Sequence, residues 1–314
     1  MSDDDYTLRS RYSTTSDEHR NIEKSLGISI ALNAIIFIVE IVGGILTNSL
    51  ALISDSLHNL SDFFALILSF IASKVVQWKS NSEKSYGYVR VEIFVAFINA
   101  MALVLIGMYV IYEGIQRFAH PEPIAGGWML IIAIVGFIVN TAATLILKTH
   151  AHHGLNIKSA YLHLLTDAIE SLAVVVVAGL IAWQDWRVLD PLVSIAIGLF
   201  IIKSAWSIVA ETVHILTEGT PRGINLEEVA SYIQSFPGVE NVHHLHIWGL
   251  SSRVRALSAH LVVQDQLISS GCKISTQLEQ ELEHRFGINH PTLQFESSVC
   301  EDQGVVVDIN HKEQ

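Results

Sequence analysis

The sequence predicts an α-helical membrane protein with six transmembrane helices, followed by a small α+β domain. Two observations support this fold class. Of the 314 residues, 50% are hydrophobic and only 16% are charged, whereas a soluble domain usually carries about 25% charged residues. Apolar stretches of the length that spans a bilayer, roughly 20 residues, occur six times before residue 213.

The six expected transmembrane helices follow one another closely. They are about Leu26–Leu46, Ser49–Val76, Val91–Phe118, Gly127–Leu147, Ala160–Trp183 and Leu192–Val213. Pro121 and Pro123 break the chain ahead of the fourth helix, because proline removes a backbone donor. Asp190 followed by Pro191 is typical of an N-cap and first helical residue, so this pair predicts the start of the sixth helix.

The pattern changes to that of a soluble domain after about residue 213. Apolar spacing and alternation predict the element order αββαβ, with helices over Leu226–Phe236 and Ile274–Phe286 and strands over Val239–Leu250, Val254–Val263 and Pro291–Glu296. This order predicts a ferredoxin-like fold with helices on one face of a sheet. We therefore divide the chain into an N-terminal tail (1–24), a membrane domain (25–213), a C-terminal domain (214–300) and a C-terminal tail (301–314).

The positions of the basic residues predict the orientation in the membrane. Of the 19 Lys and Arg residues, all but Arg117, Arg187 and Lys203 fall in the N-terminal tail, at the second and fourth connections or in the C-terminal region. Because such residues concentrate in cytoplasmic segments, both termini are expected in the cytoplasm. The net charge of −12 argues against a nucleic-acid partner, which needs a basic surface.

Two of the expected transmembrane helices carry ionisable residues in one pattern. The second helix contains Asp55, His58 and Asp62, and the fifth contains His163, Asp167 and Glu170. In each helix a His and an Asp stand four residues apart and share a face. Ionisable groups inside a membrane are rare unless they are paired or line a cavity. Two His and two Asp on facing helices suit a tetrahedral Zn²⁺ ion, so we predict metal ligation by His58, Asp62, His163 and Asp167.

Alternatives to a zinc transport site also fit this pattern. Interhelical ion pairs would need only two of the six groups, and a proton relay without a metal also uses intramembrane Asp and His. Two imidazoles argue against Mg²⁺ and Ca²⁺, and the absence of Cys from the helices argues against Cu(I). A membrane-embedded metalloenzyme would need a general base beside three ligands, but the sequence contains no HExxH or nucleophile motif.

Several motifs resemble those of the cation diffusion facilitators. They include Gly43-Gly44, Ser49-Leu50-Ala51 and the stretch from Asp55 through His58 to Asp62 in the first two helices. Tyr86-Gly87-Tyr88 and His243-His244-Leu245-His246-Ile247-Trp248 continue the resemblance, which covers about Leu26 to Glu296. The sequence is most similar to bacterial exporters of zinc, cadmium and cobalt and to eukaryotic zinc transporters.

This resemblance implies a homodimeric transporter in a lipid membrane, the inner membrane of a bacterium, and no enzymatic activity or organic cofactor. It implies export of Zn²⁺, and of Cd²⁺ or Co²⁺, in exchange for protons. His58, Asp62, His163 and Asp167 match the family's transport site residue by residue. A Mn²⁺ or Fe²⁺ exporter is the alternative within the family, although harder metals favour Asp over the two His.

The resemblance also implies a regulatory zinc site in the C-terminal domain. His243 and His260 match ligand positions of this site, Glu296 stands where the family has Asp, and Gln294 replaces a His. Strand alternation places His244, with His246 and Trp248, on the other face, where they are expected to pack.

A further group of histidines lies between the fourth and fifth helices. His150, His152 and His153 are expected either to feed metal to the transport site or to form a solvated turn.

Overall fold

The computed structural model describes residues 28, 31–32, 34–148, 155–297 and 304–305, with the side chains at 62, 66 and 155–160 left out. His150, His152 and His153 therefore lie outside the described residues. The chain forms two compact units, Met1–Leu68 with Asn99–Trp206 and Ser69–Ile98 with Ser207–Gln314.

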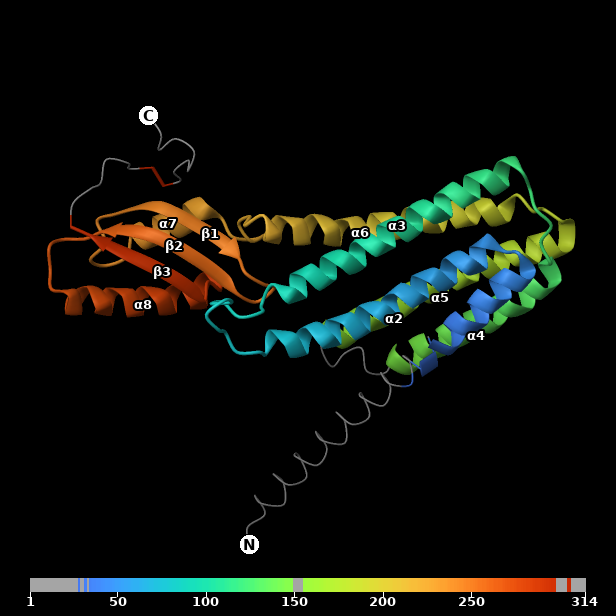
Figure 1. Ribbon diagram of the computed structural model, residues 1–314, viewed down its shortest axis with the longest axis horizontal. Helices are drawn as coiled ribbons and strands as arrows, with labels where there is room; N and C mark the ends of the chain where they lie inside the picture. The colour runs from blue at the N-terminus through green and yellow to red at the C-terminus, as the bar shows by residue number, and fades with distance from the viewer. Residues whose placement is uncertain (1–27, 29–30, 33, 149–154, 298–303, 306–314) are drawn as a thin grey trace, which may run out of the picture. The chain divides into compact units, whose positions relative to one another are not determined.

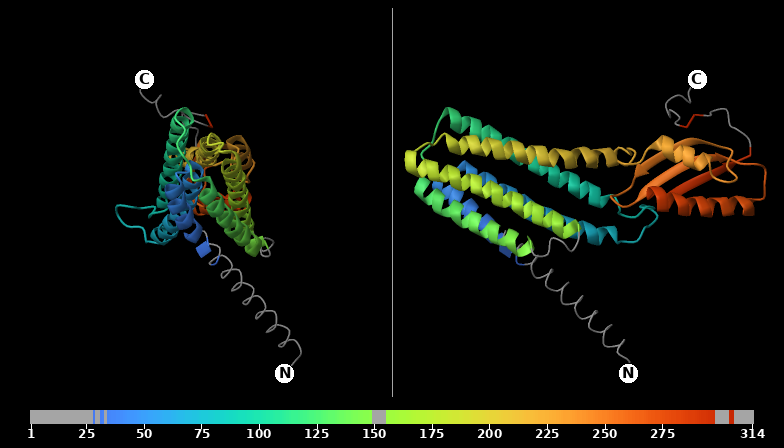
Figure 2. Two further views of the ribbon diagram at one scale, coloured as in Figure 1. Left: turned by 90° about the vertical axis from the view of Figure 1, so that its right-hand side faces the viewer. Right: turned by 180° about the vertical axis from the view of Figure 1, so that it is seen from behind.

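Five helices in the described ranges are long and apolar enough to cross a membrane. They are α2 (Leu50–Val76), α3 (Val91–Ala119), α4 (Gly126–Lys148), α5 (Leu155–Gln184) and α6 (Leu189–Leu216) (Figure 1). A shorter apolar helix, Ala34–Thr47, precedes them. These helices run side by side, as Figure 1 and the two views of Figure 2 show. Together they account for the six predicted spans and confirm the fold class.

Close packing between the helices depends on glycine. α3 and α6 meet at Gly107 and Gly198, where an added Cβ would lie 2.9 Å and 3.1 Å from the carbonyl oxygen of the other glycine. In lipid there is no hydrophobic driving force between helices, so close contact through small residues takes its place. Gly136 of α4 serves a different purpose, because it leaves room for the Glu40 carboxylate.

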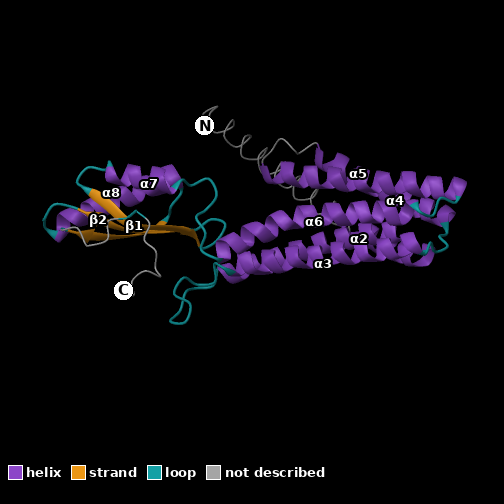
Figure 3. Ribbon diagram, turned by 90° about the horizontal axis from the view of Figure 1, so that it is seen from above, coloured by secondary structure: helices purple, strands orange, loops and turns teal. Residues whose placement is uncertain are grey.

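The C-terminal domain is a three-stranded sheet covered on one face by two helices. β1 (Asn241–Gly249) pairs antiparallel with β2 (Arg255–Val262), and β2 pairs in parallel with β3 (His290–Glu296). α7 (Leu226–Gln234) and α8 (Ile268–Phe286) lie on the same side of this sheet (Figure 3). The predicted αββαβ order is confirmed.

α8 begins at Ile268, ahead of the predicted Ile274. The extra turn contains Ser269, Ser270 and Gly271, which break the apolar spacing on which the prediction rested. The backbone N–H groups of Ser270 and Gly271 donate to the carbonyl oxygen of Leu267, so the turn forms without apolar contacts of its own.

The core of this domain lies between the helices and one face of the sheet. Val229 and Ile233 of α7 and Leu278 of α8 are fully buried against Leu257 and Leu261 of β2. Since alternate residues of a strand point to opposite faces, this packing leaves the neighbouring residues of β2, among them His260, on the face without helices.

Candidate metal centres

α2 and α5 bring together three of the four predicted transport ligands. His58 Nε2 lies 4.0 Å from Asp167 Oδ1, and His163 Nε2 lies 3.8 Å from Asp167 Oδ2. The two imidazole rings are 6.1 Å apart between centroids. Asp62 lies on α2, one turn beyond His58, and its side chain is outside the described residues.

The separations in this set are close to those around a tetrahedral zinc ion. With metal–ligand bonds of about 2.0–2.2 Å, neighbouring donor atoms lie roughly 3.3–3.6 Å apart. A small movement of the side chains would therefore close the set around an ion. Asp167 is buried and His58 nearly so, whereas the side chain of His163 is 44% exposed, so His163 is the most exposed of the three.

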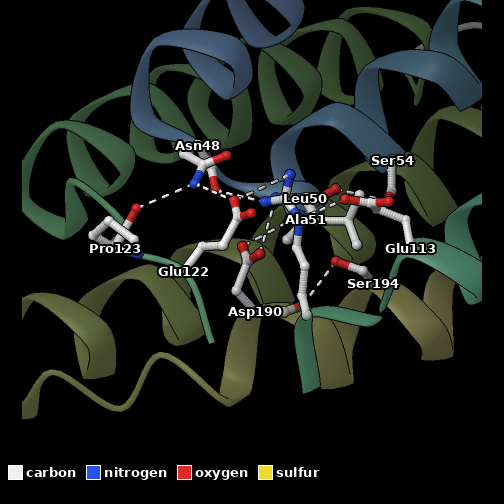
Figure 4. Close-up of polar contacts among 10 residues, drawn as sticks. Asn48, Leu50, Ala51, Ser54, Glu113, Glu122, Pro123, Asp190 and Ser194 are labelled. Atoms are coloured by element: carbon white, nitrogen blue, oxygen red, sulfur yellow. Dashed lines mark hydrogen bonds and ion pairs between the residues drawn. The ribbon is translucent and has the colours of Figure 1, made fainter. Parts of the chain in front are cut away.

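The start of α2 is fixed by a carboxylate from α6. Asp190 accepts a hydrogen bond from Ser49 Oγ at 2.6 Å. It also accepts from the backbone N–H groups of Leu50 and Ala51, at 2.8 Å and 3.2 Å (Figure 4). A carboxylate at a helix N-terminus satisfies free N–H groups and interacts favourably with the helix dipole. The sequence predicted that Asp190 caps its own helix; instead, its side chain caps α2.

Arg117, at the end of α3, also binds to the segment that precedes α2. Its Nη1 donates to the backbone oxygen of Asn48 at 2.8 Å, and its Nε donates to Glu113 Oε1 at 3.0 Å. α2 carries His58 about two turns from this end. The contacts of Asp190 and Arg117 therefore tie the helix of the metal ligands to α3 and α6.

A second cluster lies on the helix-free face of the C-terminal sheet. Glu296 Oε2 lies 3.0 Å from His243 Nε2, and Glu296 Oε1 lies 2.8 Å from His260 Nδ1. Gln294, at the position of a family histidine, donates from Nε2 to Glu296 Oε1 at 2.9 Å. The structure thus brings the three predicted ligands together, with Gln294 orienting the carboxylate.

His244 joins this cluster, so its predicted placement on the opposite face is wrong. The register of β1 against β2 shifts between His243 and His246, and His244 has a φ of +50°. Its ring centroid lies 5.2 Å from that of His243 and 4.7 Å from that of His260. One ligand atom from each of the three histidines lies within 4.8 Å of the others.

Because of the same bulge, His246 and Trp248 also lie on the helix-free face of the sheet and not on the face that the sequence predicted. His246 pairs with Ser258 and Trp248 with Ala256, and these β2 residues share a face with His260. One extra residue in a strand reverses the alternation after it. Glycine often marks such a backbone conformation, but β1 has none at the bulge, so the sequence carried no clear signal for it.

Two residues near the C-terminus support the bulge. The backbone N–H of His244 donates to the oxygen of Gly304 at 3.2 Å, and that of Leu245 donates to the oxygen of Val305 at 2.8 Å. Backbone donors that leave the regular ladder need other partners, and Gly304–Val305, here called the strap, provides them. The strap therefore holds His244 in the conformation that turns it toward the cluster.

The donors of this second cluster fit a zinc ion. Three imidazoles and one carboxylate are ligands that Zn²⁺ commonly takes. In the described part of the chain, the buried Nδ1 of His243 has no hydrogen-bond partner.

Comparison with known proteins assigns both parts of the chain to one family. Residues 26–217 match the transmembrane domain of cation efflux proteins, and residues 221–298 match their cytoplasmic domain. The chain belongs to the cation efflux family. As a member of this family it is a membrane transporter and not an enzyme, as the resemblance implied.

Relatives of this cation efflux protein are metal transporters of bacteria. A cadmium, cobalt and zinc/H⁺-K⁺ antiporter of Bacillus subtilis is 41% identical over 278 residues, which cover 88% of this chain and 89% of the relative. The metal cation efflux system protein CzcD of Cupriavidus metallidurans is 34% identical, with 92% and 91% covered. The zinc transporter ZitB of Escherichia coli is 32% identical, with 89% of each covered.

Among solved structures, one is similar in sequence to part of this chain. The metal-bound C-terminal domain of the CzcD transporter of C. metallidurans is 38% identical to this chain, covers 23% of it and 99% of its own length, and has a TM-score of 0.21.

Proposed function

We propose that this transporter exports Zn²⁺, and also Cd²⁺ or Co²⁺, from the cytoplasm in exchange for protons. The observation that carries the proposal is the convergence of His58 and His163 on the two carboxylate oxygens of Asp167. Imidazole nitrogen and carboxylate oxygen suit borderline divalent ions of this kind. The substrates named for the relatives, cadmium, cobalt and zinc, support the same class.

Exchange follows from competition for the same donor atoms. A histidine or carboxylate must give up its proton before it binds a metal, so metal and protons exclude each other in the set of His58, Asp62, His163 and Asp167. A higher proton concentration outside would therefore displace the metal there. Alternating access of the set to the two sides would then couple proton entry to metal exit.

We further infer that the C-terminal cluster binds a regulatory Zn²⁺ and that the transporter is a homodimer with both termini in the cytoplasm. His243, His244, His260 and Glu296 would hold this ion, which supplies a cross-link between the three strands of the sheet. The match of residues 221–298 to the family's cytoplasmic domain and the distribution of basic residues support this arrangement.

Transport by the purified protein in liposomes tests the proposal. Vesicles containing a metal-sensitive dye would be given Zn²⁺, Cd²⁺, Co²⁺ or Mn²⁺ on the face that carries the C-terminal domain, with and without a more acidic interior. We expect uptake of the first three metals that rises with the gradient. Uptake of Mn²⁺ alone, or uptake that does not respond to the proton gradient, would contradict the proposed function.

A further inference from the structure

A second group of buried polar side chains lies beside the transport ligands. Asn59 Nδ2 donates to Glu40 Oε2 at 3.2 Å, and Ser171 Oγ donates to Asp55 Oδ2 at 3.4 Å. The carboxyl groups of Glu40 and Asp55 lie within hydrogen-bond reach of each other. Both residues are at most 2% exposed, so water does not compensate for their charges.

No basic side chain among the described residues compensates for these charges either. In that part of the chain, the partners of Glu40 and Asp55 are Asn59, Ser171 and each other. The charged group that faces the pair from α5 is Asp167, which is also acidic. Buried ionised carboxylates are strongly unfavourable without a counter-charge, so the pair needs a cation.

α4 provides the remaining wall of this group. An added Cβ at Gly136 would collide with Glu40 Oε1, so glycine is what allows the carboxylate to lie against α4. Asn140, one turn further along, is fully buried and donates from Nδ2 to Ser171 Oγ at 2.7 Å. Its Oδ1 has no hydrogen-bond partner among the described residues, which is unfavourable for a buried acceptor unless a donor or a cation occupies the space.

We propose that Glu40, Asp55 and Asn140 form a second cation site of the membrane domain, and that this site takes the counter-cation of the metal antiport. All of its donor atoms are oxygens, which favour a hard cation over Zn²⁺. The neighbouring metal set, by contrast, offers the imidazole nitrogens that Zn²⁺ prefers. The ligand is a monovalent cation of this class, a proton or an alkali ion. The inference rests on the proposed antiport and adds to it a separate place where the exchanged ion binds.

The placement of the two sites explains why their occupants would exclude each other. Asp55 precedes His58 by three residues on α2, and Ser171 follows Asp167 by four residues on α5. Each pair is therefore about one helical turn apart, roughly 5 Å. Two cations at this distance in a poorly solvated core repel each other strongly. Binding of a metal in one site thus favours release of the cation from the other.

The test compares binding with transport in variants that remove the charges but keep the shapes. The double variant Glu40→Gln, Asp55→Asn would be made in a His260→Ala background, which removes a ligand of the cytoplasmic cluster. Ser54→Ala is the matched control, because Ser54 is buried beside Asp55 and its hydroxyl, within the described part of the chain, donates to Leu50 of its own helix. Zinc binding would be measured in detergent, and zinc uptake in liposomes under a proton gradient at equal K⁺ or a K⁺ gradient at equal pH.

We expect the double variant to bind zinc nearly as tightly as the control does. Its gradient-driven uptake should be at least about tenfold lower, a factor that lies within the usual range for coupling between two sites. Loss of the response to pH identifies the cation as a proton, and loss of the response to K⁺ identifies it as an alkali ion. Gly136→Ala, which keeps every charge but crowds Glu40, should reduce the same response.

Two results would overturn the second site. One is a double variant that retains the full response to both gradients. The other is a double variant whose zinc binding falls as far as its uptake, which would make the carboxylates part of the metal set. A wild-type protein that takes up zinc without responding to either gradient would instead contradict the antiport itself, so the two failures are distinguishable.

Discussion

Asp167 is the residue on which the transport set depends, because each of its carboxylate oxygens faces one histidine. The spacing of four residues between His and Asp predicted this convergence, since such residues share a helix face. His244 is the opposite case. Its role depends on a single backbone angle in β1, which alternation in the sequence does not encode.

Replacing Asp167 with Asn removes the charge that faces both histidines and keeps the shape of the side chain. We expect the metal affinity of the transport set to fall by more than about 100-fold, since changes outside the ligand shell already cost 10–100-fold. Zinc titration in detergent, in a His260→Ala background, measures this. Thr166→Val is the control, because the Thr166 hydroxyl donates to Leu162 of its own helix and to no other described residue. Equal affinities in the two variants would remove Asp167 from the site.

His244→Ala should weaken zinc binding at the cytoplasmic cluster by about 10- to 100-fold, because one of four donors is lost. His246→Ala is the matched control, since His246 lies on the same face of β1 but pairs with Ser258, away from the cluster. Cobalt spectra and zinc titration of the full chain with Asp167→Asn isolate this cluster. A larger effect of His246→Ala would show that the ligands are wrongly assigned.

At the scale of elements, two features are built by contacts from distant segments. The bulge of β1 depends on the strap, more than fifty residues further along the chain, and the start of α2 depends on Asp190 of α6. The helices themselves were predictable because apolar length is a local property of the sequence. These two contacts were not, since pairing between distant segments leaves no periodic pattern.

Truncation after Gln303 removes the strap, whereas truncation after Val306 keeps it. We expect the shorter chain to lose zinc affinity at the cytoplasmic cluster about as much as His244→Ala does, because the strap acts by holding that residue. Combining the truncation with His244→Ala should then add little, as for residues that act through each other. Full additivity in zinc titrations of the four chains would show that the strap acts elsewhere.

Asp190→Ala should lower the free energy of unfolding by about 1–2 kcal/mol, the usual cost of losing a helix N-cap. Asp190→Asn keeps one acceptor oxygen and should lose less. Thermal unfolding in detergent reports the difference. Asp185→Asn is the control, because Asp185 is exposed, its side chain pairs with Arg187 among the described residues, and asparagine tolerates its φ of +54°; it should not shift the midpoint. Equal shifts for Asp185→Asn and Asp190→Ala would contradict the capping role.

At the scale of the whole molecule, the division into an apolar helical part and a small α+β part was readable from composition and spacing. The family confirms both parts. A homodimer stays a prediction. The excess of acidic residues in the chain affects how readily two copies associate. The net charge of −12 means that two copies repel each other, and bound cations offset such repulsion.

Zinc should therefore strengthen association of two copies through the cytoplasmic cluster. A metal that binds one arrangement better than another shifts the population by that difference in affinity. The dimer fraction of the full chain in detergent would be measured with and without zinc, then in the variant His243→Ala, His260→Ala. An identical response of both proteins would mean that these histidines do not regulate association.

The strap has one more consequence, which concerns solubility. β1 is an outer strand of the sheet, and a free strand edge is a template for pairing with another chain. Gly304 and Val305 occupy the donors of that edge at His244 and Leu245. In a protein proposed to pair with its own copy, an open edge would offer a second, non-specific way to associate. By occupying these donors, the two residues reduce the tendency of the strand edge to aggregate.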